Sequence, residues 1–541
     1  MRAIGAIAFS LFVVACSSAE QPPEPTLEIT SPARGTMAAA GPIEVSGRAT
    51  NAQQVFVNQQ PVTPAADGTF TTTVNLDAGI SIIESHAVSG AADIKDVRAV
   101  LAGPTAPTDG SVKAPLGAHA SLAALKSIGN AIATEAKAID YTALAQPMNP
   151  VYNNTGCLGA RIDITSISLS NVGVALAPAA TSLATDVTIS NVVVKLHADY
   201  KAACIGGSTT ITVKASAAHL HGALGVAVAA GKIKTSIGSV SVALDNFDLD
   251  VGGVPGPVED LFNGIVRGKV ESALTTMIHD KVPGLADGAL AGLVAKPLTA
   301  TILDKSTTFT ATPTKASVSA SGLYVAVDTT VVVTDGDGAA ALAQPMPMND
   351  DLISQSQGVG LALAADAVNQ LFAGLWAAGA LDKSLPIASV GALGAILDSN
   401  ATTIDIHLAL PPTVTTGPDG LQLAVGDLMV TTKDAAGTPV QALAVSVKTT
   451  LKAGPSQTGK LLLTVGTPEV HAQIVAQSDV VTRPLTDDAV EGIVTSVWGL
   501  VGDAADTALG KLPMPAFAGI QLGAPAIKGA DGYLIADIAV N

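Results

Sequence analysis

Three short patterns in the chain carry side chains that could do chemistry. His219 and His221 lie two residues apart on a predicted strand, so they share one face and could supply two ligands to a metal ion. Gly454–Lys460 approaches a phosphate-binding loop, in which backbone N–H groups and a lysine hold phosphates. Asp335–Gly338 carries two carboxylates at the spacing used by calcium-binding loops.

Each of these patterns is incomplete. No Cys, His or carboxylate at ligand spacing joins the histidine pair, which favours two solvent-facing side chains. Leu461 stands where a phosphate-binding loop needs Ser or Thr, and Asp335–Gly338 lacks its remaining carboxylates, so both segments are better interpreted as turns. A Gly-x-Ser-x-Gly motif does not occur either. The sequence therefore predicts a protein that is not an enzyme and has no cofactor or metal.

The first cysteine belongs to a targeting segment. Arg2 precedes the apolar run Ile4–Ala15, which is too short to span a bilayer. The run ends in Val13-Val14-Ala15-Cys16, which resembles a bacterial lipobox and implies acyl chains on Cys16 and cleavage before it. An ordinary secretory signal with an incidental Cys16 is the alternative. Because residue 17 is Ser rather than Asp, we expect a lipid-anchored protein of the bacterial cell envelope, at the outer membrane, facing the periplasm or the cell surface.

The other two cysteines, Cys157 and Cys204, form the one remaining pair. In an exported chain such a pair is expected to close as a disulfide. Two free thiols are the alternative.

The composition limits the partners of the chain. Of 541 residues, 48% are hydrophobic and 13% charged, yet only 3% are aromatic, so the cores must be built from Ala, Val and Leu. The net charge of -17 argues against nucleic acid, whose phosphates require Lys and Arg. It argues equally against electrostatic docking on anionic lipid head groups.

The N-terminal region comes after the targeting segment of residues 1–16. Residues 17–26 form a polar, Pro-rich tether. Residues 27–102 contain short alternating strands separated by turn signals such as Asp67-Gly68. This pattern resembles bacterial immunoglobulin-like modules, which implies an all-β sandwich and a possible protein partner. Residues 103–114 are predicted to be a linker.

A long helix is predicted at Val258–Val294, and the rest of the chain is organised around it. Every fourth residue is apolar: Val258, Phe262, Val266, Val270, Leu274, Ile278, Val282, Ala286, Leu290 and Val294. A spacing of four overshoots the 3.6-residue turn, so the apolar stripe drifts around the helix and its burial must be shared between two surfaces. Pro283-Gly284 is predicted to kink or break the helix.

Strands and further helices surround this element. A helix is predicted at Leu116–Ile139, followed by alternating strands that fit an antiparallel sheet with one wet face. A second round of strands begins at Thr307 and contains a helix at Asp366–Ala378. The four-residue period returns in a C-terminal helix at Ala489, Ile493, Val497, Val501, Ala505 and Leu509.

This order resembles the tubular lipid-binding (TULIP) superfamily, in its two-module branch of bactericidal/permeability-increasing (BPI-like) proteins. The resemblance is most specific at Leu509–Val540, where a helix runs into Pro513-Met-Pro515 and closing strands, and at Val359–Leu381, which contains the pair Ala378-Gly379. It implies an α+β fold of two curled antiparallel sheets, each wrapped on a long helix, at residues 115–305 and 306–541. The disulfide of that family joins late strands of its first module, whereas Cys157 and Cys204 bracket earlier ones.

The resemblance also implies a function. Members of the family hold an acyl lipid in an apolar slot between helix and sheet, so we expect a membrane-anchored lipid-binding protein that holds or transfers acyl lipids. The residues expected to line the slots are Val258, Phe262, Ile265, Val266, Leu274, Met277, Ile278, Phe372, Trp376, Ile493, Val497, Trp498 and Val501. For any one of them, packing in a closed core is the simpler interpretation. The rival function, favoured by the high Ala content, is a non-enzymatic surface scaffold or adhesion lipoprotein with closed cores.

Overall fold

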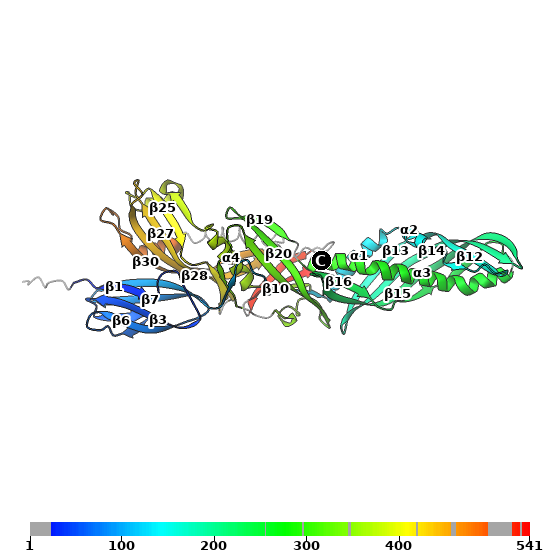
Figure 1. The fold of residues 1–541 in the computed structure, drawn as a ribbon, viewed down its shortest axis with the longest axis horizontal. Helices are drawn as coiled ribbons and strands as arrows, with labels where there is room; N and C mark the ends of the chain where they lie inside the picture. Colours follow the sequence, from blue (N-terminus) through cyan, green and yellow to red (C-terminus); the bar gives the residue numbers. More distant parts are fainter. Residues whose placement is uncertain are drawn as a thin grey trace, which may run out of the picture.

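The computed structural model describes residues 23–254, 256–294, 297–344, 348–417, 420–455, 461–495, 522–530 and 533–540. The molecule is elongated, with a pair of lobes at one end, a sheet in the middle and a narrow module at the other end (Figure 1). The fold is mixed α+β and is built mostly from antiparallel strands, including two large curled sheets. No helix among the described residues has the length and apolarity needed to cross a bilayer.

One of the paired lobes is an N-terminal β-sandwich, which we call the N-terminal sandwich. Its core is apolar and includes Val45, Phe70 and Ile83. The smaller sheet has the order β1 (Thr26–Ser31), β3 (Gly41–Thr50), β6 (Thr69–Leu76). The larger sheet has the order β2 (Thr36–Ala38), β8 (Ala92–Ala102), β7 (Gly79–Ser89), β4 (Gln54–Val57), β5 (Gln60–Val62).

The middle of the molecule is one seven-stranded sheet drawn from distant parts of the chain. Its order is β19 (Leu298–Ile302), β20 (Lys305–Ser319), β21 (Gly322–Val333), β10 (Val112–Ser121), β23 (Val359–Ala364), β32 (Tyr533–Val540), β31 (Leu522–Ala530). A two-stranded ribbon of β9 (Thr105–Pro107) and β22 (Ala340–Leu342) adjoins it. Strand β10 corrects the prediction of a helix from Leu116, because helix α1 begins only at Leu122.

Met348 packs closely on β10 in the segment where the helix was predicted. A Cβ on Gly117 would lie 2.8 Å from the sulfur of Met348, so this side chain lies directly against the strand backbone. Ser121 then ends the strand and caps α1, since its hydroxyl accepts a hydrogen bond from the Ala124 N–H at 3.4 Å.

The narrow end is the first module. Its sheet has the order β11 (Tyr152–Asn153), β12 (Gly159–Ser168), β14 (Ser182–Ala202), β15 (Ile205–Ala229), β16 (Lys232–Ile237). Strand β13 (Asn171–Ala179) pairs with β14, and β17 (Ser241–Asp245) and β18 (Asp248–Val251) pair with β15. The helical segments are α1 (Leu122–Lys137), α2 (Tyr141–Ala145), the 3-10 turn Gln146–Met148, α3 (Gly256–Leu290) and the 3-10 turn Ala291–Leu293. A kink or a break was predicted at Pro283-Gly284, and the break is wrong, because α3 continues to Leu290.

The second module forms the other of the paired lobes and adjoins the middle sheet. Its curled sheet, the second sheet, has the order β24 (Lys383–Pro386), β25 (Thr403–Leu408), β27 (Gly420–Lys433), β28 (Pro439–Pro455), β29 (Leu461–Val465). Strand β26 (Thr413–Gly417) pairs with β27, and β30 (Glu469–Gln477) pairs with β28. Its helical segments are α4 (Ala365–Ala377), the 3-10 turns Asp350–Leu352 and Ile387–Ala395, and a helix at 487–495.

Candidate functional site

Helix α3 packs along the first module with its four-residue stripe inward. Val258, Phe262 and Val266 are 0% exposed, the later members Leu274 and Ile278 are 3% and 6% exposed, and Met277 beside them is 4% exposed. The helix contacts β14, β16 and β17 of the sheet and also α1 and α2. The drifting stripe is therefore buried by two kinds of surface, the sheet and the two neighbouring helices.

A half-buried apolar rim runs beside this stripe, and we call the rim and the stripe together the seam. Ile265 is the one predicted slot residue of α3 that is only partly buried. Further half-buried apolar side chains pack against the same core from the chain between β16 and α3: Val240, Val242, Phe247, Leu249, Val251 and Val254. The guanidinium of Arg267 lies 5.4 Å from the ring centroid of Phe247, so α3 and the rim meet across a cation–π contact.

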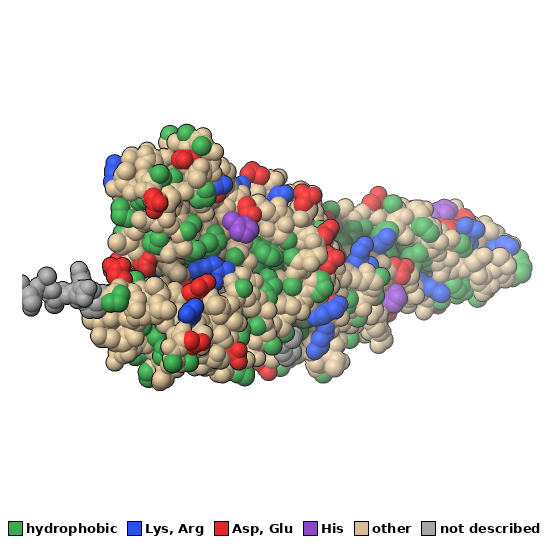
Figure 2. Space-filling model, turned by 60° about the vertical axis from the view of Figure 1, so that its left-hand side comes forward, with side chains coloured by type: hydrophobic (Ala, Val, Ile, Leu, Met, Phe, Trp, Pro, Cys, Tyr) green, Lys and Arg blue, Asp and Glu red, His purple; other side chains and the backbone are tan. Residues whose placement is uncertain are grey.

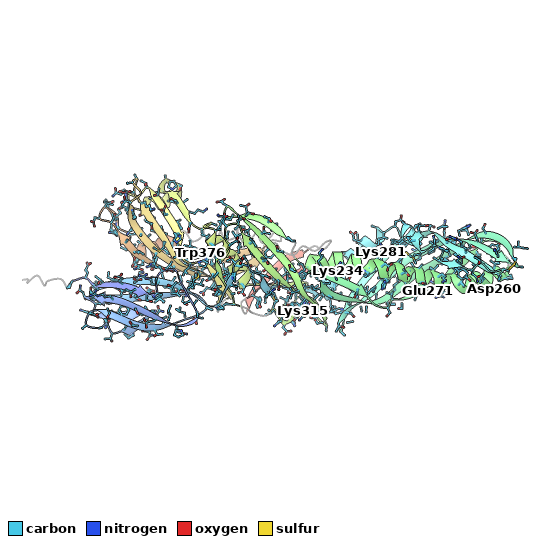
Figure 3. All side chains as sticks on the ribbon, viewed as in Figure 1. Lys234, Asp260, Glu271, Lys281, Lys315 and Trp376 are labelled. Carbon is cyan, nitrogen blue, oxygen red and sulfur yellow. A yellow bond between two sulfur atoms is a disulfide. The ribbon has the colours of Figure 1, made fainter. Side chains whose placement is uncertain are left out.

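Polar contacts tie α3 to β16 at the end of the seam nearest the middle sheet. The Asp287 carboxylate accepts hydrogen bonds from the Thr235 N–H at 2.6 Å and from Lys234 Nζ at 2.8 Å. The hydroxyl of Thr235 donates to the Pro283 carbonyl at 2.9 Å. In Figure 3, Lys234 lies toward the middle of the molecule and Asp260, near the start of α3, lies at the far tip, so the seam runs lengthwise between them.

The predicted slot residues of the second module are only partly described. Phe372 is half-buried against a cluster that includes Val368, Val414 and Leu421. Trp376, labelled in Figure 3, is also half-buried, and its indole N–H donates to the Leu408 carbonyl at 2.7 Å. Ile493 is half-buried on the helix at 487–495, and Val497, Trp498 and Val501 lie outside the described residues.

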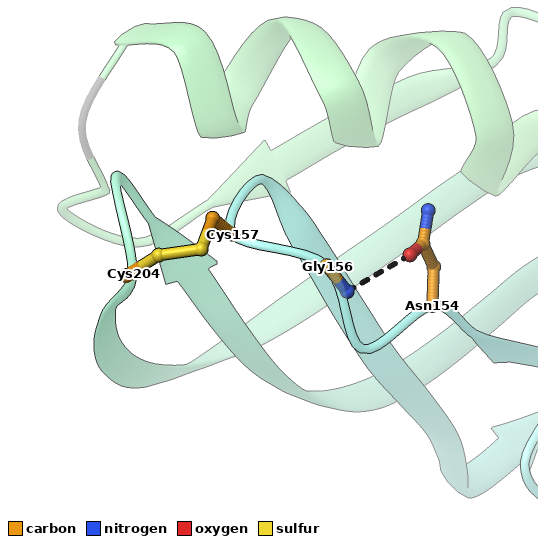
Figure 4. The surroundings of a disulfide bond; sticks show 4 residues. All are labelled: Asn154, Gly156, Cys157 and Cys204. Atoms are coloured by element: carbon orange, nitrogen blue, oxygen red, sulfur yellow. Dashed lines mark hydrogen bonds between the residues drawn. A yellow bond between two sulfur atoms is a disulfide. The ribbon is translucent and has the colours of Figure 1, made fainter.

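The predicted disulfide is confirmed. Cys157, between β11 and β12, is joined to Cys204 in the turn between β14 and β15 (Figure 4). The same turn is held by a hydrogen bond from the Cys204 N–H to the Cys157 carbonyl at 3.0 Å. A cavity of about 320 Å³ lies next to it, lined by residues that include Arg161, Tyr200 and Gly207.

The motifs that suggested metal chemistry make ordinary contacts. His219 Nε2 lies 3.1 Å from Asp245 Oδ2, and His221 pairs with Asp186 on the neighbouring strand. Asp335 has a φ of 65° in a turn and pairs with Lys305 at 3.2 Å. Among the described residues, no three His, Cys, Asp or Glu side chains come together as metal ligands. Of the segment Gly454–Lys460, residues 456–460 lie outside the described part.

A contact that the sequence reasoning missed joins the N-terminal sandwich to the second sheet. Ile80, Ala99 and Leu101 of β7 and β8 form one buried cluster with Leu410 and Ala424 of the second module. Gly426 lies where a Cβ would be 2.7 Å from the Ala99 Cβ, so only glycine permits this approach. Figure 2 shows charged and histidine side chains gathered where the two lobes meet.

A buried ion pair accompanies this apolar contact. Arg34 Nη1 lies 2.6 Å from Asp427 Oδ1, and the Asp427 side chain is 0% exposed. Asp427 also accepts hydrogen bonds from the Gly35 and Ala99 N–H groups at 3.4 and 3.3 Å. Burial raises the pKa of Asp427 and lowers that of Arg34, while their mutual attraction opposes both shifts. The N-terminal sandwich is thus firmly docked on the second sheet.

No protein-family model and no curated protein matches the chain. Among solved structures, it is similar to a lipopolysaccharide binding protein, with 15% identity and a TM-score of 0.43 over 80% of this chain and 99% of that one. It is also similar to P47 of Clostridium botulinum E1, with 9% identity and a TM-score of 0.26 over 80% of this chain and all of that one. Latherin matches 31% of this chain and 71% of its own, with 19% identity and a TM-score of 0.16. Because each TM-score is below 0.5, the description of the fold rests on the sheet topology.

Proposed function

We propose that the protein is a membrane-anchored lipid-binding protein that holds an acyl chain in the seam of the first module. The observation that carries this proposal is the half-buried rim beside α3, where a row of apolar side chains stays partly in contact with solvent. An acyl chain laid between this rim and α3 would remove apolar surface of both partners from water, at about 25 cal/mol per Å².

The dimensions and connections of the seam suit such a ligand. Helix α3 has 35 residues and is therefore about 52 Å long, which exceeds the length of a common acyl chain. Strands β17 and β18 have only 5 and 4 residues, and both pair with β15. Such short edge strands can move away from α3 at a small cost in hydrogen bonds, which would admit the ligand.

The proposed anchor comes from the sequence, because residues 1–22 lie outside the described part. Acylation at Cys16 would hold the chain at the outer membrane of a bacterial envelope. The first described strand, β1, lies in the lobed end, opposite the tip of the first module (Figure 1). An anchor at that end would therefore place the seam away from the membrane that holds the protein.

The rival function is a surface scaffold or adhesion lipoprotein with closed cores. It is favoured by the deep burial of Val258, Phe262 and Val266, which leaves them no contact with a ligand unless the seam opens. A protein partner for the N-terminal sandwich fits either function and stays a prediction.

The test is lipid occupancy of protein prepared without detergent. We expect Cys16→Ser to release the chain from the membrane fraction, so this form can be purified and examined by native mass spectrometry and organic extraction. Ile265→Asp in the same background places a carboxylate in the rim and should weaken lipid binding at least tenfold, the effect of about 1.4 kcal/mol of lost binding free energy, and so lower the occupancy. Leu303→Asp is the matched control, since Leu303 is 40% exposed in the β19–β20 hairpin.

Two results would count against these proposals. A Cys16→Ser chain that stays in the membrane fraction as the parent does would exclude the acyl anchor. A parent chain that carries no lipid, and takes up no fluorescent fatty acid or phospholipid analogue, would exclude the lipid-binding proposal and leave the scaffold. Melting curves of the Asp variants show whether lost occupancy reflects lost folding.

A further inference from the structure

A row of five titratable side chains crosses the contact between the N-terminal sandwich and the second module. Asp93 comes from β8, His86 and Glu84 from β7, and His471 and Glu469 from β30. His86 Nδ1 lies 3.0 Å from Asp93 Oδ1, and His86 Nε2 lies 3.1 Å from Glu84 Oε1. Within the row, carboxylates and imidazoles therefore alternate.

The second half of the row bridges the two lobes. His471 Nδ1 lies 3.0 Å from Glu84 Oε2, and His471 Nε2 lies 3.1 Å from Glu469 Oε1. All members of the row except Asp93 line a solvent-connected cavity of about 310 Å³, whose wall also includes Asn58, Ile82 and Lys448. This end of the contact is therefore open to solvent, and we call it the wet end, whereas the end at Ala99 and Ala424 is buried.

The geometry of the row determines which protonation states of the imidazoles allow all of its contacts. A neutral imidazole has one donor nitrogen and one acceptor nitrogen, and an ionised carboxylate can only accept. Because both nitrogens of both imidazoles face carboxylates, all four contacts can form only when His86 and His471 are doubly protonated. The row then carries three negative and two positive charges.

We propose that this row is a pH-operated latch, in which protonated His471 ties β30 to Glu84 of β7 and loss of its proton loosens the wet end of the contact. The buried end stays docked, because Arg34, Asp427 and the apolar cluster around Ala99 are independent of the imidazoles. The latch thus changes how firmly two lobes are joined without separating them.

Two lysines lie near the row. Lys448 of β28 lines the same cavity and is opposite Glu469 in the strand register. Lys95 of β8, opposite His86 in the strand register, is paired at 2.7 Å with Glu491 of the helix at 487–495, which also carries Asp487. When His471 loses its proton, Glu84 Oε2 and Glu469 Oε1 each lose a cationic partner.

The pKa shifts of Glu84 and His471 agree with a latch that is closed while His471 is protonated. The hydrogen bond from His471 lowers the pKa of Glu84 to about 2, and the hydrogen bond to Glu84 raises the pKa of His471 above its ordinary 6.5. A raised histidine pKa gives stability that is complete below 6.5 and lost as the pH rises through the folded value. A lowered carboxyl pKa gives stability that is present above the ordinary 4.5 and lost as the pH falls toward 2. The latch is therefore closed between about pH 4.5 and 6.5 and opens as the pH rises through the raised pKa of His471.

Hydrogen exchange of the intact chain tests the latch. His471→Gln keeps roughly the side-chain size, but the new side chain cannot be protonated. His407→Gln is the matched control, because His407 lies on β25, away from the row, and pairs with Asp382 at 3.0 Å. Each variant is compared with the parent at the same pH, so that intrinsic exchange rates cancel. Peptides covering 82–88 and 469–474 are followed by mass spectrometry at about pH 6 and about pH 8.5, on either side of the histidine titration.

We expect both peptides to exchange about fivefold faster in His471→Gln than in the parent at about pH 6, as loss of a charge-assisted hydrogen bond implies. At about pH 8.5 the ratio should approach one, and His407→Gln should match the parent at both. A ratio of one at about pH 6, or an equal ratio at the two pH values, would overturn the proposal. Glu84→Gln, which removes the acceptor from the other lobe, must reproduce the result if His471→Gln does not fold.

Discussion

The two curled sheets differ in how many of their faces are covered. In the first module, β14 alternates between buried and exposed residues along most of its 21 residues, so the face away from the helices stays wet. In the second module, Leu443, Val445 and Val447 of β28 pack toward Val490 of the helix at 487–495. The opposite face near β27 is covered as well, by the N-terminal sandwich.

Side-chain size explains the difference. Ala424 and Gly426 of β27 are small enough for β7 and β8 to approach closely, and Asp427 supplies an acceptor at the same place. The outer face of the first sheet carries polar side chains such as Asp186, Lys195 and Lys214, which are exposed. One curled sheet is therefore built to receive another domain, whereas on the outer face of the other sheet these polar side chains stay exposed among the described residues.

The largest effect on stability is expected at the buried ion pair Arg34–Asp427, where the N-terminal sandwich contacts the second sheet. Asp427→Ala removes the nearer carboxylate partner of Arg34, leaves only the carboxylate of Asp96 at 3.9 Å, and should lower the free energy of unfolding by about 3–5 kcal/mol. The matched control in the first module is Glu271→Ala, which breaks the exposed Arg267–Glu271 pair on α3 and should cost about 0.3–0.5 kcal/mol. Chemical denaturation measures both, and equal losses would contradict the difference between the two regions.

A smaller effect is expected from added volume. Ala424→Leu inserts three carbons between β27 and the N-terminal sandwich and should destabilise the chain by about 1–3 kcal/mol. Ala177→Leu, at an exposed position of β13, makes the same change on the first sheet and should alter stability by less than about 0.5 kcal/mol. If thermal or chemical unfolding shows no difference between the two variants, the docked face is not tightly packed.

The sequence predicted the features that depend on local periodicity. The four-residue stripe identified α3, the alternation of β14 and β15 identified an antiparallel sheet, and the isolated pair Cys157 and Cys204 identified the disulfide. The break at Pro283 was wrong, because a helix packed along its whole length tolerates the loss of one hydrogen bond.

The docking of the N-terminal sandwich was beyond sequence reasoning. Arg34 and Asp427 are 393 residues apart, and each alone has the pattern of an ordinary charged turn or strand residue. Ala424 and Gly426 likewise fit any strand, and only the structure shows what covers them. The half-buried rim was missed for a related reason. The four-residue stripe identifies residues of the helix, whereas Phe247 and Leu249 lie in the segment between β16 and α3, which has no such period.

The lipid-binding proposal is tested most directly by mapping where an acyl chain lies. A fatty acid with a photoreactive group on its acyl chain is added to detergent-free Cys16→Ser protein, cross-linked and located by peptide mass spectrometry. We predict adducts in peptides covering 240–254 and 256–270, which contain the two sides of the seam. We predict fewer adducts in the peptide covering 439–447 of the second sheet. Adducts confined to exposed loops, or spread evenly over the chain, would contradict a binding seam in the first module.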